Sequence, residues 1–133
     1  MNDIFKIDND KLRIETILDK SVVHLIIPEG IKSISFNAFE GCDNLEQVDL
    51  PASITKVGNL KSCPSLYRIN ISGDNAKFCS VDGILYKKDG TAIYVVPRNI
   101  NMRDYQIPES VKAIYNWGFY GNKNIKCSYP RQC

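Results

Sequence analysis

Apolar residues recur along this chain at a fixed spacing. Pairs of corresponding residues in the first two copies stand 23 positions apart: Pro28 and Pro51, Ile31 and Ile54, and Ile34 and Val57. In the second half of the copy the spacing shortens to 21, as for Phe39 and Leu60, Cys42 and Cys63, and Leu45 and Leu66. A copy that starts at Ile107 matches the first at a constant offset of 80, and another begins over residues 66–71 and then breaks off. The chain is therefore built from repeats.

Each copy predicts a short strand, a proline that ends it, and a turn with an aromatic and a small residue. In residues 45–50 the alternation points Val48 and Leu50 inward and Gln47 and Asp49 to the open side. One copy cannot bury its apolar face alone, so copies stack and share a linear core. The expected interior columns are Phe39, Leu60 and Phe119, and Ile31, Ile54 and Val111.

Two other segments show strand patterns. Residues 78–97 alternate on both sides of Lys88-Asp89-Gly90 and predict a β-hairpin, with a second turn at residues 81–83. Tyr86 and Tyr94 are expected to face each other across its strands, as packing aromatics rather than ligand-stacking rings. Residues 5–18 predict strands that close the first coil. Residues 125–133 begin another coil, which is either a crude cap or a cut end.

Length and composition indicate one folded domain over residues 1–133. The chain is 44% hydrophobic and 24% charged, which disfavours disorder. We divide the domain into an N-terminal cap (1–21), repeats (22–72), a hairpin insert (73–97) and a last repeat with the C-terminal end (98–133).

Charge and hydropathy exclude several partners. A net charge of +2 is too small for a nucleic-acid surface. No apolar run approaches the roughly 20 residues that span a bilayer, so we expect no membrane insertion. The start lacks a secretory signal, which would keep the chain as written in the cytoplasm, while an excised domain would lack its signal as well. Localisation therefore stays open.

The sequence offers little chemistry. Five cysteines without a C-x-x-C pair predict reduced thiols rather than a disulfide framework, and we expect no metal and no cofactor. Nucleotide, hydrolase and zinc-protease motifs are absent. His24, the sole histidine, falls at an outward position of a predicted strand, so we interpret it as a surface residue and expect no catalytic site.

The run of residues 27–45, Ile-Pro-Glu-Gly-Ile-Lys-Ser-Ile followed by Ala-Phe-Glu-Gly-Cys-Asp-Asn-Leu, resembles the repeat of BspA-like leucine-rich-repeat proteins. Residues 80–91 are similar to the hairpin insert of such proteins. The resemblance implies a leucine-rich-repeat solenoid, right-handed and curved, with an inserted β-hairpin. It also implies a bacterial surface protein that adheres to matrix proteins, host cells or other bacteria, without catalysis. The short second repeat and Asn122, where the family usually has Cys, depart from the pattern.

The exposed strand face is the candidate binding surface. Alternation assigns these members to it: His24, Ile26, Gln47, Asp49, Arg68, Asn70, Asp104 and Gln106. Ordinary solvated strand positions are an equally good interpretation, although the apolar Ile26 suggests a contact. Two functions follow: a protein-binding or adhesion module whose partner is a host matrix or cell-surface protein, or a structural spacer of a larger repeat protein.

Overall fold

The computed structural model describes residues 4–100 and 107–115. Over these residues the chain is rich in β-strands, and its single helix is the short 3-10 turn η1 (Leu60–Ser62). The strands are β1 (Phe5–Asp8), β2 (Arg13–Ile17), β3 (His24–Ile26), β4 (Ser33–Ile34), β5 (Gln47–Leu50), β6 (Arg68–Ile71), β7 (Phe78–Val81), β8 (Ile84–Lys87), β9 (Ala92–Val95) and β10 (Ala113–Ile114).

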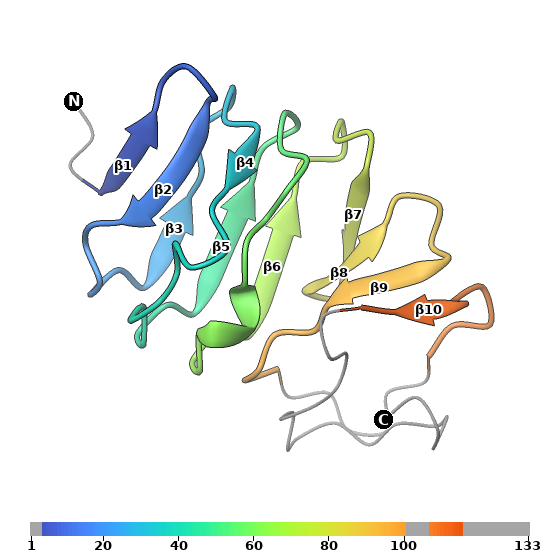
Figure 1. Cartoon of the computed structure of the whole chain (residues 1–133). Coiled ribbons are helices and arrows are strands. Elements are labelled where there is room, and N and C mark those ends of the chain that lie inside the picture. Colours follow the sequence, from blue (N-terminus) through green and yellow to red (C-terminus); the bar gives the residue numbers. More distant parts are fainter. Residues whose placement is uncertain (1–3, 101–106, 116–133) are drawn as a thin grey trace.

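Equivalent strands of successive copies lie side by side and parallel. One sheet has the order β3-β5-β6, with Leu25 beside Val48 and Val48 beside Ile69. A second sheet has the order β1-β2-β4, in which β1 and β2 are antiparallel and β2 runs parallel to β4. Figure 1 shows these strands arranged along one direction, with β7 to β10 at the far end. The ladder has this form because each copy returns the chain to the same position one strand further on.

The burial expected for the interior columns of the first two copies is confirmed. Phe39 and Leu60 are fully buried in one hydrophobic cluster, together with Ile31 and Ile54. Phe119, the expected third member of the aromatic column, lies outside the described residues. Like residues stack because the turn of each coil repeats the geometry of the one before it.

Asn75 explains why the third copy breaks off. It stands 21 residues after Ile54, at the position that Ile31 and Ile54 occupy in their own coils, and it is 1% exposed. Its side-chain Nδ2 donates to the carbonyl oxygens of Pro51, Ala52 and Ile54 at 3.2, 3.1 and 2.9 Å. A buried amide that satisfies three carbonyls can replace an apolar residue without leaving polar groups unpaired. The apolar column therefore ends at a buried polar side chain that is hydrogen-bonded to the preceding coil.

The next segment changes the direction of pairing. Strands β7, β8 and β9 pair antiparallel, with turns that place Asp82, Gly83 and Gly90 at positive φ. Side chains of β8 alternate between two hydrophobic clusters, with Leu85 in the cluster of the repeats and Tyr86 in a second one. This antiparallel unit is therefore packed on both of its faces.

Two expectations about this part of the chain are wrong. Val111 does not join the column of Ile31 and Ile54, because it packs against the second cluster on the other side of the antiparallel unit. Tyr86 and Tyr94 do not face each other. The ring of Tyr94 contacts Phe78 edge-on at 5.0 Å between centroids, whereas Tyr86 is buried in the second cluster. Successive residues of a strand point to opposite faces of the sheet. Because of the register shift between Leu85 and Tyr86, the residue of β9 that lies opposite Tyr86 is not Tyr94.

The hairpin at the start of the chain and the antiparallel unit each pair in the same way with a strand that follows them in the chain. The β1–β2 hairpin presents β2 to β4, and β9 of the later unit is presented to β10 with parallel register. Ser35 donates its backbone N–H to Ile14 at 2.9 Å, and Tyr115 donates to Ile93 at 2.8 Å. A hairpin therefore stands before the first repeat and before the one that begins at residue 107.

The described cysteines are free thiols. Cys42 and Cys63 are buried and Cys79 is partly exposed, which agrees with the expected reduced state for these three. Burial raises the pKa of both inner thiols, that of Cys63 to about 12. Cys127 and Cys133 lie outside the described residues. The inner thiols act as small apolar residues of the core.

The described residues contain neither a membrane-spanning helix nor a cluster of metal ligands. Within residues 4–100 and 107–115 no helix has the length and hydropathy needed to cross a bilayer. The same ranges contain no group of three or more His, Cys, Asp or Glu side chains placed to hold a metal ion.

Candidate binding face of the parallel sheet

The sheet β3-β5-β6 places six of the eight candidate residues in two rows. Its buried side chains include Leu25, Val48 and Ile69, so the residues on either side of each point the other way. The register aligns His24, Gln47 and Arg68 in one row and Ile26, Asp49 and Asn70 in the other. We call these six residues the strand face. The other two candidates, Asp104 and Gln106, lie outside the described residues.

Asp49 is the centre of the strand face. Its Oδ2 lies 2.8 Å from Nε2 of His24. Its Oδ1 accepts hydrogen bonds from the side-chain amides of Gln47 at 3.2 Å and Asn70 at 3.0 Å. One carboxylate thus connects all three strands of the sheet. A fixed network of this kind presents side chains in defined positions, which lowers the conformational entropy lost when a partner binds.

The electrostatics of Asp49 agree with this central role. Partial burial raises the pKa of its carboxyl group, but the hydrogen bonds from Asn70, His24 and Gln47 outweigh that effect, and the pKa falls below its ordinary value of 3.8. Asp49 is consequently ionised at neutral pH and serves as an acceptor.

The remaining members give the face its mixed character. Arg68 donates from Nε to the side-chain oxygen of Asn70 at 3.1 Å, so its planar group is oriented along the sheet. Ile26 is 64% exposed beside the polar network. The strand face therefore offers a cation, a carboxylate, amides and one apolar side chain in close proximity.

The antiparallel unit borders the strand face, and the sequence analysis did not predict this contact. Ile69 of β6 donates its backbone N–H to Gly83 at 2.9 Å, and a Cβ atom at Gly83 would stand only 3.3 Å from the Cα of Arg68. Glycine is needed here for its positive φ of 85° and for this close approach. The Asp82-Gly83 turn pattern was visible in the sequence, but its place beside Arg68 was not.

Lys61 is a second residue that the sequence did not single out. Its Nζ donates to the carbonyl oxygen of Val96 at 2.8 Å and so connects η1 with the segment after β9. Burial, with a smaller contribution from the nearby charge of Arg98, lowers the pKa of Lys61 to about 8. The contact is structural, since it lies between two packed segments.

The imidazole of His24 contacts the carboxylate of Asp49, so the sole histidine is part of the hydrogen-bond network of the strand face. Hydrogen-bond donors and acceptors on a rigid sheet are the features that a protein partner contacts.

Comparisons with known proteins agree with the fold. Residues 16–81 match the family described as BspA type Leucine rich repeat region (6 copies). The structure is similar to a leucine-rich repeat protein from Eubacterium ventriosum, with a TM-score of 0.68 and 22% identity over 77% of this chain and 28% of that one. It is also similar to the pneumococcal vaccine antigen PcpA, with a TM-score of 0.62 and 24% identity over 80% of this chain and 33% of that one.

This chain thus spans about a third or less of the length of either solved protein. None of the curated proteins matches it. Proteins with such repeats generally serve as protein-interaction or surface modules. The matched repeat region and the stacked parallel strands together establish that this chain belongs to the BspA-type leucine-rich-repeat family.

Proposed function

We propose that this chain is a non-catalytic protein-binding or adhesion module, and that the strand face is its binding surface. The single observation that carries the proposal is the network around Asp49, which fixes side chains of three parallel strands in one plane. The partner is a protein, and the repeat family favours a matrix or cell-surface protein for a module displayed outside a bacterial cell.

The proposal includes the shape that the family resemblance implies. We propose a right-handed, curved solenoid in which the antiparallel unit β7–β9 is an insert between coils. Its position beside Arg68 supports a role as a wall of the binding surface.

A structural spacer is the second candidate. It is supported by the position of β3, which is an outer strand of the sheet β3-β5-β6 and carries the exposed Ile26. A further coil could pair with an outer strand of this kind. A spacer needs the stack of coils but not the polar network on the strand face.

One pair of variants separates the two functions. Arg68→Glu reverses a charge on the strand face, and Lys56→Glu makes the same change at an exposed residue bridged to β4 in the other sheet. Both proteins would be passed by surface plasmon resonance over a panel of purified extracellular-matrix proteins. We expect Arg68→Glu to weaken binding by about tenfold or more and Lys56→Glu to leave it within about twofold.

Adding Ile26→Asp tests the apolar member of the strand face. We expect the double variant of Ile26 and Arg68 to lose detectable binding while its thermal unfolding stays close to that of the wild type, because both side chains are exposed. Equal binding by the wild type and the double variant would exclude the strand face as the site.

A further inference from the structure

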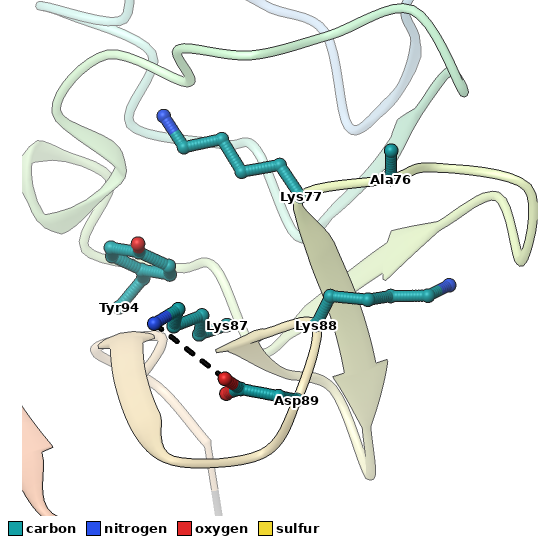
Figure 2. Close-up of a pocket in the computed structure, with 6 residues that line it drawn as sticks. All are labelled: Ala76, Lys77, Lys87, Lys88, Asp89 and Tyr94. Carbon is teal, nitrogen blue, oxygen red and sulfur yellow. Dashed lines mark ion pairs between the residues drawn. The ribbon is translucent and has the colours of Figure 1, made fainter.

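A second candidate site lies on the antiparallel unit, away from the six residues of the strand face. An open hollow of about 520 Å³ is lined by Ala76, Lys77, Lys87, Lys88, Asp89 and Tyr94. Its walls come from the segment that enters β7, from the β8–β9 turn and from β9 (Figure 2). The volume is within the range of pockets that hold small organic ligands.

The backbone around the hollow is held firmly. The side-chain oxygen of Asn75 accepts hydrogen bonds from the backbone N–H groups of Lys77 and Phe78, both at 2.8 Å. Lys88 donates its own backbone N–H to Lys77 at 2.8 Å, which joins the two lysine-bearing segments. The walls therefore keep their separation without a ligand, as preorganised sites do.

Asp89 is fixed in the same way. One of its carboxylate oxygens accepts from the hydroxyl of Thr91 at 2.6 Å and from the Thr91 backbone N–H at 3.0 Å. These two hydrogen bonds lower the pKa of Asp89 below its ordinary value. The other oxygen lies 3.6 Å from Nζ of Lys87. The hollow consequently contains one oriented carboxylate beside one ammonium group.

Three lysines line the hollow, and the ammonium group of Lys87 is the one that points toward Asp89 and Tyr94 (Figure 2). Lys77 and Lys88 extend in opposite directions at the rim (Figure 2). Lys77 donates to the Thr55 carbonyl oxygen at 2.8 Å and Lys88 to that of Gly73 at 2.9 Å. An ammonium group carries three N–H donors, and the hydrogen bond to the carbonyl oxygen uses one of them in each of these lysines. All three side chains are exposed and can turn toward a ligand.

Tyr94 forms the apolar wall. Its ring is packed edge-on against Phe78 and stacked on Tyr115, with 5.2 Å between the two tyrosine centroids. The packing holds Tyr94 in place, so the wall beside Lys87 is rigid.

We propose that this hollow, the lysine hollow, binds a saccharide that carries a carboxylate or a sulfate group. The lining combines an excess of cations with one fixed carboxylate acceptor, and it therefore matches a ligand in which an anionic group stands beside hydroxyl groups. A peptide is the poorer match. Side chains from the bend before β7, the end of β8, the β8–β9 turn and β9 line the hollow, whereas an extended peptide needs an open strand edge for its backbone.

The test uses the complete chain and three tetrasaccharides in isothermal titration calorimetry. Hyaluronan tetrasaccharide supplies carboxylates, chondroitin 4-sulfate tetrasaccharide adds sulfates, and chitotetraose is neutral. The variant Lys87→Gln with Lys88→Gln removes two charges from the lysine hollow. The matched control, Lys6→Gln with Lys11→Gln, removes two charges from the corresponding hairpin β1–β2.

We expect at least one acidic tetrasaccharide to bind, with an affinity that falls as salt is added, and chitotetraose not to bind. The variant of the lysine hollow should lose about tenfold or more in affinity and the control pair less than about twofold. The preferred acidic ligand then identifies the anionic group. Circular dichroism melting of both variants shows that the fold is retained.

The proposal would be overturned by no binding of either acidic tetrasaccharide, by equal binding of chitotetraose, or by equal weakening by both pairs of substitutions. A tetraglutamate peptide that binds more tightly than the saccharides with the same lysine dependence would also overturn it, since the occupant would be a peptide. Arg68→Glu leaves the lysine hollow intact, so failure here is distinguishable from failure of the strand face.

Discussion

Nε2 of His24 and Oδ2 of Asp49 lie 2.8 Å apart, although 25 residues separate them in the chain. The contact joins neighbouring strands β3 and β5 on the side of the sheet opposite the core. Gln47 and Asn70 donate to the other oxygen of the same carboxylate. Five of the six strand-face residues, all except Ile26, are thus connected by hydrogen bonds, and this network is the reason we propose recognition as the role of the face.

The network makes stability depend on pH below neutrality. Asp49 has a folded-state pKa below its ordinary value of 3.8, so its contribution is present above that value and is lost as the pH falls through the folded-state pKa. We expect Asp49→Asn to reduce the loss of stability between pH 7 and pH 3, measured by urea denaturation at both pH values. Asp43→Asn, a change at an exposed turn residue, is the control. The same pH dependence in the wild type and Asp49→Asn would contradict the role of the carboxylate.

Asn75→Ala should be strongly destabilising. The substitution removes the side-chain amide that donates to three backbone carbonyl oxygens, and it removes the acceptor of two backbone N–H groups. We expect a loss of about 2–4 kcal/mol in the free energy of unfolding, measured by urea denaturation. Asn9→Ala, in the exposed turn between β1 and β2, should change it by less than about 0.5 kcal/mol. A small effect at Asn75 would mean that it does not terminate the apolar column.

Two phenylalanines three residues apart test the stacked core. Phe39 is 0% exposed and Phe36 is 67% exposed. Phe39→Ala should lower the free energy of unfolding by about 3–5 kcal/mol, because it opens a cavity in the column shared with Leu60. Phe36→Ala should lower it by less than about 0.5 kcal/mol. Similar losses in the two variants, measured by guanidinium denaturation, would rule out the proposed column.

Alkaline pH should weaken the fold through Cys63. Burial raises the folded-state pKa of this thiol from 9.0 to about 12. Its contribution to stability is therefore complete below about pH 9 and is lost as the pH rises toward 12. We expect the stability of Cys63→Ala to fall less between pH 8 and pH 10.5 than that of the wild type, in urea denaturation with reductant present.

The control for this experiment is Cys79→Ala, because Cys79 is only partly buried. Lys61 acts in the opposite sense. Its folded-state pKa of about 8 lies below the ordinary 10.5, so its contribution rises with pH over that interval. Both variants retain Lys61, and the difference between each variant and the wild type therefore isolates the thiol. An unchanged pH dependence in Cys63→Ala would contradict the prediction.

Periodicity alone was enough to find the repeats, the inward positions and the candidate face. The spacing of Phe39 and Leu60 identified a buried column, and the alternation around Val48 separated core from surface. Burial follows local sequence here because each coil repeats the path of its neighbour, so the same position in each copy has the same surroundings. The family was recognisable for the same reason.

The tertiary structure determined which residues of different coils are in contact. Only stacking brings His24 and Asn70 to the carboxylate of Asp49, and only the return of the chain over the previous coil places Asn75 against three carbonyl groups. The separation of Val111 from Ile54 likewise depends on a unit packed between two clusters. A repeat pattern specifies which side of a strand is buried. Contacts between coils depend on distances of a few ångströms, and those are fixed only when the coils pack.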